Sequence, residues 1–231
     1  NWSFSIDNAL TQYLASGQSV TAVYRITVTD DSGYLTASGS HEARQATQDV
    51  TITLNGANDP AVISVQTGNS DTAGLTESST GLTASGSLTI RDSDLTDTVT
   101  VAVQAVTPTG VTDGLVSTTA QLLAMLTVTP AAPSLVLSST EVVDQFSWAF
   151  NSGSELFTYL AASEVLTLTY NLRATDSAAA ISNKALTITI TGTNSGPTIS
   201  VVDVSGSIVE SSRLSDSGSF TFADVDRSNR R

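Results

Sequence analysis

Residues 54–64 read LNGANDPAVIS, and residues 190–200 read ITGTNSGPTIS. Each stretch follows a run in which apolar residues alternate with threonine, VTIT before Leu54 and ALTIT before Ile190, and each leads into a second apolar run. A period of two is typical of half-buried strands, and Gly, Asn and Asp are typical of the turns between them. The chain therefore uses the same strand–turn–strand phrase twice, 136 residues apart.

The repetition extends over most of the chain. Matching motifs are offset by 146 residues as far as Asp30, and by 136 residues after ten extra residues in the first copy, around 39–48. Further on, the offset is 133 and then 132 residues. The matched pairs are Trp2-Ser3-Phe4 with Trp148-Ala149-Phe150, Tyr13-Leu14-Ala15 with Tyr159-Leu160-Ala161, Tyr24 with Tyr170, Thr29-Asp30 with Thr175-Asp176, Asn58 with Asn194, Ile63-Ser64-Val65 with Ile199-Ser200-Val201, Glu77 with Glu210, and Asp92-Ser93-Asp94 with Asp224-Val225-Asp226. Matches that keep Trp, Tyr and Asp in register indicate an internal repeat.

The matches divide the chain into three parts. We predict the C-terminal part of one repeat over 1–59, a complete repeat over 60–196, and the N-terminal part of a third repeat over 197–231. Because the chain opens at Asn1-Trp2 inside a strand pattern, we expect it to be an excerpt from a longer polypeptide.

The hydrophobic pattern predicts an all-β fold built of β-sandwiches in tandem. Helical periodicity is confined to 118–126, with one further helical turn expected within 154–160. Trp2 and Trp148 occupy equivalent strand positions flanked by aromatic residues, so both are predicted to lie in a core. Strand-like runs of alternating residues occur at 23–28, 87–90, 99–103 and 166–170.

The composition excludes several classes of function. There is no Cys, so neither disulfides nor thiolate chemistry are available. The formal net charge is −13, from 22 acidic and 9 basic residues, and a phosphate-binding surface needs the opposite sign, so we expect no nucleic-acid partner. No apolar stretch approaches the roughly 18 residues of a transmembrane helix.

The single histidine, His41, lies in the ten-residue insertion and is predicted to be a loop residue. Catalytic triads and zinc sites are therefore excluded, and we predict that the chain is not an enzyme.

The expected direction of each strand indicates at which end of the sandwich the acidic residues lie. If the complete repeat starts near Pro60, its first strand runs from the top of the sandwich to Glu77 at the bottom, and the strand over about 84–91 returns to the top. The hairpin between the last two strands also turns at the top. Five oxygen-bearing residues should then converge on the junction with the preceding repeat, namely Asn58, Asp59, Asp92, Asp94 and Asp176.

A second, weaker set is expected at the junction with the following repeat, namely Glu77, Asn194, Asp224 and Asp226. Ca²⁺ takes six to eight oxygen ligands and requires neither Cys nor His, so these residues supply its chemistry. Carboxylates held close together repel one another unless a cation compensates them. The alternative is that each Asp caps a turn, since Asx-turns are common at strand ends. The spacing alone leaves both interpretations open.

Several phrases resemble the VCBS repeat, an Ig-like or cadherin-like module that occurs in tandem in large bacterial RTX-type surface adhesins. They are Glu77-Ser78-Ser79, Gly86 to Asp94 (GSLTIRDSD), Phe157 to Tyr170 (FTYLAASEVLTLTY), Ala174-Thr175-Asp176-Ser177 and Thr189 to Asn194 (TITGTN). The resemblance implies a β-sandwich extender that is exported, often by type I secretion, and stabilised by Ca²⁺. It favours calcium at the junctions. Where the family boundary has Asn-Asp, the second boundary reads Asn194-Ser195, which implies a weaker site there.

The resulting hypothesis is that the chain has a mechanical function. We expect a structural extender, or stalk, of an extracellular adhesin at the bacterial cell surface, stiffened by calcium at its junctions, with the neighbouring repeats of the same chain as its partners. The alternative is a module that binds glycans or a host surface through 39–48 or 107–121, cell-surface or matrix glycans being the partner of the parent protein. An accessory region of an extracellular polysaccharide-active enzyme is a third interpretation.

The two end parts come from complementary portions of the repeat. Residues 1–57 correspond to its last strands and 198–231 to its first strands, so both should expose unpaired strand edges. Pairing of the two parts between neighbouring molecules is a further hypothesis.

Overall fold

The computed structural model describes residues 1–35, 37–39 and 41–227. It contains one short α-helix and one 3₁₀ turn, and strands dominate the rest, which confirms the predicted all-β fold. The elements are η1 (Asn8–Leu10), β1 (Ser19–Leu35), β2 (His41–Asn55), β3 (Val62–Ser64), β4 (Thr72–Thr76), β5 (Thr83–Arg91), β6 (Val99–Gly110), α1 (Thr119–Ala124), β7 (Leu126–Thr129), β8 (Val143–Asn151), β9 (Val165–Asp176), β10 (Ile181–Thr191), β11 (Thr198–Val201) and β12 (Phe220–Ala223).

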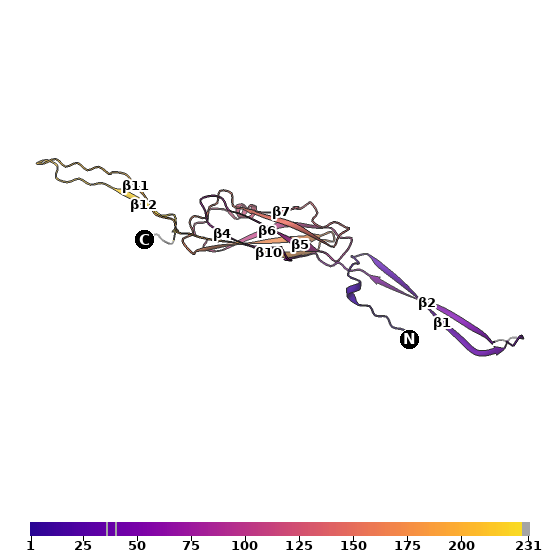
Figure 1. Ribbon diagram of the computed structural model, residues 1–231. Coiled ribbons are helices and arrows are strands. Elements are labelled where there is room, and N and C mark those ends of the chain that lie inside the picture. Colours follow the sequence, from indigo (N-terminus) through magenta and orange to yellow (C-terminus); the bar gives the residue numbers. More distant parts are fainter. Residues whose placement is uncertain (36, 40, 228–231) are drawn as a thin grey trace.

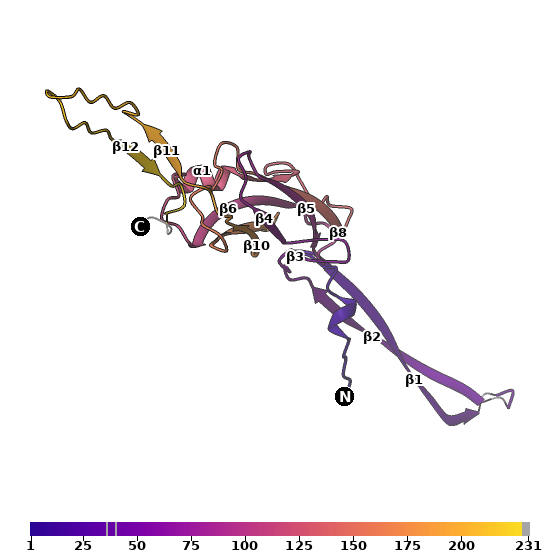
Figure 2. The same cartoon turned by 60° about the vertical axis from the view of Figure 1, so that its left-hand side comes forward.

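The strands form one complete unit flanked by two incomplete ones. β3 to β10 build a central sandwich, from which the β1–β2 hairpin and the β11–β12 hairpin extend at opposite ends (Figures 1 and 2). The repeat pattern in the sequence predicted this arrangement, because only the middle part contains every strand of the unit.

The central sandwich is of the Ig-like type, with two four-stranded sheets packed face to face. One sheet has the order β3-β5-β8-β7 and the other β4-β10-β9-β6; β4 pairs parallel with β10, and the other strand pairs are antiparallel. The first strand of the repeat is therefore divided: β3 begins in one sheet, and β4 continues downward in the other. The direction matches the prediction, because Glu77 directly follows β4 at the end of the sandwich remote from Asp176.

The core follows from the alternation of side chains. Along β9, every second residue from Leu166 to Asp176 is buried, as expected for a strand with one face on the core. The polar atoms of two aromatic side chains in the core also have hydrogen-bond partners. Trp148 Nε1 donates to the Ser70 carbonyl at 2.7 Å, and the Tyr170 hydroxyl donates to the Leu122 carbonyl at 2.9 Å.

The two tryptophans differ although they occupy equivalent positions. Trp148 is 1% exposed, as predicted for a core residue, whereas Trp2 is 61% exposed, so the prediction for Trp2 was wrong. The cause is topological. Trp148 lies in β8 beside β5, with its indole ring against Gly86, whereas among the described residues no strand pairs with the segment that contains Trp2.

Two helical predictions had different outcomes. α1 forms within 118–126, where Thr118 and Gln121 make a reciprocal capping box. No helix forms within 154–160, which has turns at 154 and at 158–159 and is otherwise irregular. The insertion also differs from expectation, because most of 39–48 lengthens the β1–β2 hairpin and His41 begins β2 instead of lying in a loop. Residue 40 lies outside the described residues.

Candidate metal centre

The repeated Gly-x-Asn phrase marks the place where the chain leaves a sandwich. At Gly192 an added Cβ would collide with the carbonyl oxygens of Leu160 and Ala161, and the Gly192 N–H donates to the Glu164 carbonyl at 2.8 Å. Only glycine permits this approach of two backbones. The Gly-x-Asn segment therefore holds the last strand close to the preceding loop, just before the linker begins.

The same contact is present at the first junction. An added Cβ at Gly56 would collide with the carbonyl oxygens of Leu14 and Ala15, and the Gly56 N–H donates to the Gln18 carbonyl at 2.8 Å. The two junctions thus begin from the same local structure, although the first belongs to an incomplete unit.

At the first junction, the linker is tied to the loop that follows β5. The Asp59 N–H donates to Asp94 Oδ2 at 2.8 Å, and the Asp94 N–H donates to Asp92 Oδ1 at 3.1 Å. The Leu95 N–H reaches the Tyr13 carbonyl of the preceding unit at 3.4 Å. The Asp-Ser-Asp turn thereby joins linker, sandwich and neighbouring unit.

Asp176, the last residue of β9, closes the junction from the other sheet. Its Oδ1 accepts the Ala180 N–H at 2.8 Å, and its Oδ2 accepts the side-chain amide of Asn58 at 3.0 Å. The Asn58 amide oxygen has no hydrogen-bond partner. The predicted residues therefore lie together in two hydrogen-bonded groups, Asn58 with Asp176 and Asp59 with Asp94 and Asp92. The two groups meet where a carboxylate oxygen of Asp92 lies within 4.8 Å of one of Asp176.

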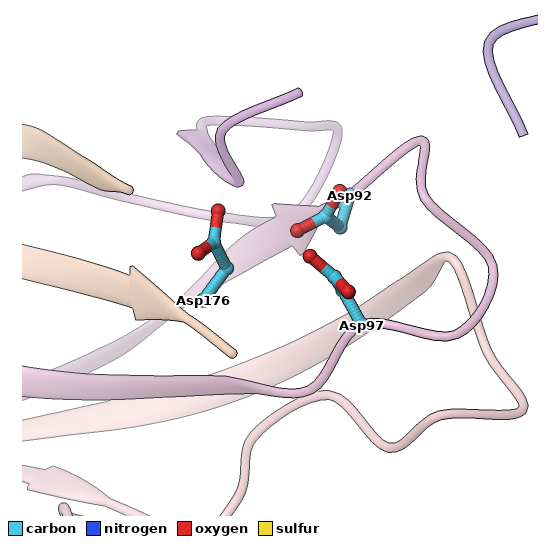
Figure 3. A group of neighbouring side chains, drawn as sticks. All are labelled: Asp92, Asp97 and Asp176. Atoms are coloured by element: carbon cyan, nitrogen blue, oxygen red, sulfur yellow. The ribbon is translucent and has the colours of Figure 1, made fainter. Parts of the chain in front are cut away.

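One further residue belongs to this cluster, although no pattern in the sequence predicted it. Asp97, in the loop between β5 and β6, has a carboxylate oxygen within 4.8 Å of oxygens on both Asp92 and Asp176, and the three side chains face one another in Figure 3. The self-comparison could not find Asp97, because the corresponding residue of the third repeat is Asn229. The remaining indication in the sequence was that Asp97 follows Asp94 by only three residues.

These carboxylates are buried without a compensating cation. Asp92, Asp94, Asp97 and Asp176 are all buried, and among residues 1–35, 37–39 and 41–227 no Lys or Arg forms an ion pair with them. One carboxylate oxygen on each of Asp92, Asp94 and Asp97 is buried with no hydrogen-bond partner. Buried charges of one sign are costly unless they are paired or coordinate a metal.

Burial dominates the electrostatics of the cluster. It raises the pKa of Asp92 to about 6, against the opposing hydrogen bond from the Asp94 N–H, and the negative charges of Asp94, Asp97 and Asp176 raise it further. Burial likewise raises the pKa of Asp94, opposed by the hydrogen bond from the Asp59 N–H. Without a cation, ionisation of the cluster therefore acts against the folded state.

The donor set fits calcium. It offers carboxylate and amide oxygens only, and the free oxygens are buried. Ca²⁺ is bound in proteins by such oxygens, whereas zinc and the later transition metals favour nitrogen or sulfur ligands. A bound Ca²⁺ would be held by Asp92, Asp97 and Asp176, with Asp94 and the Asn58 amide oxygen beside them.

The second junction repeats the hydrogen bonds but not the cluster. The Ser195 N–H donates to Asp226 Oδ2 at 2.9 Å, and the Asp226 N–H donates to Asp224 Oδ1 at 3.0 Å, as in the first junction. Glu77 is buried and accepts the Thr193 hydroxyl at 2.6 Å. Asn194 is exposed, with its amide donating to the Ser195 carbonyl at 3.3 Å.

Within the described part of the chain, the second junction gathers no three acidic side chains as closely as the first. The second junction also contains a positively charged side chain, Arg227, which forms an ion pair with Asp113 at 3.1 Å. At the equivalent position the first junction has Leu95. The second-junction set of Glu77, Asn194, Asp224 and Asp226 stays a prediction.

No family model matches the sequence, and no curated protein matches it either. Solved structures similar to the chain include PapD-like domain 7 of human CEP192, with 10% identity over 58% of this chain and 86% of that one, at a TM-score of 0.36. The CooA pilin subunit of enterotoxigenic Escherichia coli matches with 12% identity over 58% of this chain and 97% of the pilin, at a TM-score of 0.36. The EC1-4 region of PcdhgB3 matches with 14% identity over 89% of this chain and 41% of that chain, at a TM-score of 0.40.

Among the described residues, no helix has the length and apolar character needed to cross a membrane.

Proposed function

We propose that this chain is a section of a structural extender in a bacterial cell-surface adhesin, and that calcium stiffens the junction between its sandwiches. The observation that carries the proposal is the cluster of Asp92, Asp97 and Asp176, whose buried carboxylates meet at the base of a linker and form no ion pair with a Lys or Arg of the described residues. A catalytic function has no comparable support in the chain, and the proposed role is non-enzymatic.

The stiffening follows from where the ligands are attached. Asp92 and Asp97 flank the turn after β5, Asp176 ends β9 in the opposite sheet, and Asn58 belongs to the linker. A cation shared by these groups would cross-link both sheets to the linker and remove the repulsion among the carboxylates. The preceding unit would then be held in a fixed direction, which is what an extended stalk requires.

Location and export rest on the resemblance to VCBS repeats. Calcium is plentiful outside the cell and scarce in the cytosol, so the junction would stiffen only after export, with type I secretion as the implied route. The partners in this proposal are the neighbouring repeats of the same chain. The glycan-binding alternative has less support, because most of 39–48 lengthens a hairpin and 107–110 belongs to β6.

The proposal is tested by thermal unfolding of the 231-residue chain in EDTA, in millimolar Ca²⁺ and in millimolar Mg²⁺. Binding to the folded state alone adds about 3–4 kcal/mol when free ion exceeds the dissociation constant by 100- to 1,000-fold. For a domain of this size, that corresponds to a rise in midpoint on the order of 10 °C. We expect this rise with Ca²⁺ and a much smaller one with Mg²⁺.

The control is a matched pair of variants. The double variant Asp92→Ala, Asp94→Ala should lose the calcium response, whereas Glu210→Ala, which removes an exposed carboxylate in the C-terminal hairpin at the opposite end of the central sandwich, should keep it. Equal responses to Ca²⁺ and Mg²⁺, or an unchanged midpoint with either ion, would mean that the acidic residues only cap turns.

A further inference from the structure

A small cavity opens beside α1, at the end of the central sandwich from which the β11–β12 hairpin extends (Figure 2). Its volume is about 270 Å³, and all of its lining residues belong to the central unit, between Ser117 and Glu155. Cavities that hold drug-sized ligands measure roughly 300–1,000 Å³, so this one has room for a single small ring. No residue of the calcium cluster lines it.

Glu155 lines the cavity with a carboxylate that has no counter-ion. The residue is 8% exposed, and among residues 1–35, 37–39 and 41–227 no Lys or Arg forms an ion pair with it. The Ser117 N–H and hydroxyl both donate to Glu155 Oε2, at 3.2 and 2.6 Å. Oε1 receives no hydrogen bond from any described residue and is not enclosed by protein atoms. Because buried polar groups normally have partners, this oxygen is available to a ligand in the cavity.

Two side-chain amides complement this acceptor. Gln121 Oε1 accepts the Thr118 N–H and hydroxyl, at 2.8 and 2.9 Å, and Asn151 Oδ1 accepts the Gly153 N–H at 2.9 Å. These bonds fix the orientation of both amides. Their NH₂ groups, with two donors each, have no acceptor among the described residues. The cavity therefore combines oriented donors with the free acceptor of Glu155.

The backbone around the cavity is held by hydrogen bonds to the core. The Ser152 N–H donates to the Leu82 carbonyl at 3.0 Å, and Ser152 Oγ accepts the Leu82 N–H at 2.9 Å. The Asn151 N–H donates to the carbonyl of Met125, a buried apolar residue that also lines the cavity. An apolar surface with a few fixed polar groups is typical of preformed ligand sites, which lose little freedom on binding.

The first junction shows that a following repeat does not cover this position. Residues 5–9 of the first unit are equivalent to 151–155, at the offset of 146 residues. All five are exposed, although the complete central sandwich follows them. The cavity therefore stays open to solvent within an array of repeats.

We propose that this cavity binds one neutral sugar ring. Each hydroxyl of a sugar can both donate and accept, so neighbouring hydroxyls can donate to Glu155 Oε1 and accept from the amides of Gln121 and Asn151. The C–H face of the ring packs on Met125. The Glu155 carboxylate repels a sugar acid, and the net charge of −13 adds to this repulsion. The site gives the extender a carbohydrate contact along its length and does not depend on calcium.

The test is a titration of the full 231-residue chain in EDTA, followed by ¹H–¹⁵N NMR. The neutral probes are glucose, galactose, mannose, fucose and N-acetylglucosamine, and the anionic probes are glucuronate and N-acetylneuraminate. At least one neutral sugar should shift the backbone amides of Ser117 and 151–155 saturably. The expected dissociation constant is on the order of 1 mM, the scale for a ligand of about a dozen heavy atoms. No saturable shift with any neutral sugar, or equal shifts with the acids, would overturn the proposal.

Methyl glycosides distinguish two sources of the ring. If a methyl glycoside of the bound sugar binds as the free sugar does, the cavity takes the end of a glycan. If neither anomer binds, it takes a free monosaccharide. Because the titrations contain no free calcium and the cavity shares no residue with the calcium cluster, failure of this proposal leaves the calcium proposal standing.

Two variants test the assigned contacts. Glu155→Gln keeps an oxygen for Ser117 but replaces the free acceptor with a donor, and it should weaken binding by at least about tenfold. Gln121→Glu, at an exposed position, keeps the oxygen for Thr118 and removes both donors, so it should weaken binding without disturbing a buried residue. The control is Glu141→Gln, an exposed position near the first junction, which should bind like the unmodified chain. Thermal unfolding shows that each variant is folded. Unchanged affinity in Gln121→Glu, or in folded Glu155→Gln, would overturn the proposal.

Discussion

Asp97 and Asp176 approach each other within 4.8 Å through a carboxylate oxygen of each, although one lies in the loop after β5 and the other ends β9 in the opposite sheet. Asp92 lies within the same distance of both. Three acidic side chains from two sheets thus face a common point at the end of the sandwich, beside the linker to the preceding unit. Such an arrangement is costly without a cation and stabilising with one.

Asp97→Asn should weaken calcium binding by at least about tenfold, which is about 1.4 kcal/mol. The reason is that one of the three convergent carboxylates loses its charge while its shape is kept. Isothermal titration calorimetry with CaCl₂ measures the effect, and Glu141→Gln serves as the control for loss of one negative charge. Unchanged affinity in Asp97→Asn would remove Asp97 from the site.

In EDTA, the stability of the central sandwich should fall as pH rises through about 6. The folded-state pKa of Asp92 is raised to about 6, against about 3.9 in the unfolded chain, so the folded state binds the proton more tightly. The contribution of Asp92 is then fully present below about pH 4 and lost as pH rises through the folded pKa.

Asp92→Asn is the test of this sign, because asparagine resembles the protonated carboxyl. In EDTA at pH 7, the variant should unfold at a higher temperature than the unmodified chain, and the two should converge towards pH 4. In Ca²⁺ the order should reverse at pH 7, since the ion requires the ionised group. Parallel midpoints across this pH range in EDTA would contradict the assignment.

Gly192→Ala should destabilise the central sandwich by about 2 kcal/mol, the usual scale of overpacking. The added methyl group would enter the space held by the carbonyl oxygens of Leu160 and Ala161. Urea unfolding measures the change. Gly196→Ala is the matched control in the same linker, because no heavy atom lies within 4 Å of its added Cβ. Equal midpoints for the two variants would show that the close approach is not maintained.

Trp148→Ala should cost about 3–5 kcal/mol, the range for removal of a large buried aromatic side chain. Trp2→Ala should cost less than about 1 kcal/mol in dilute solution, although both residues occupy the same position of the repeat. The difference arises because β5 pairs beside Trp148, whereas no strand of the described residues pairs with the segment around Trp2. Chemical unfolding below the concentration of any self-association compares the two. Similar costs would mean that Trp2 is also buried in the monomer.

Much of this molecule follows from local patterns. Alternation with a period of two predicts the strands, and the recurrence of Trp, Tyr, Gly-x-Asn and Asp-Ser-Asp phrases predicts one complete unit with a part on either side. Strand direction alone also placed Asp92, Asp94 and Asp176 at the same end, because antiparallel neighbours return to the edge from which the first one left.

Tertiary structure decided the rest. Asp97 belongs to the cluster through the path of a loop, and loop paths have no periodic signal. The first strand divides between two sheets as β3 and β4, which no alternation of residues could indicate. Trp2 and Trp148 are the clearest case, since equal positions in the repeat led to opposite burial. Sequence determined which face of each strand is apolar, because that depends on the residue and its neighbours. Whether such a face is buried depends on which strands pack against it, and only the tertiary structure decides this.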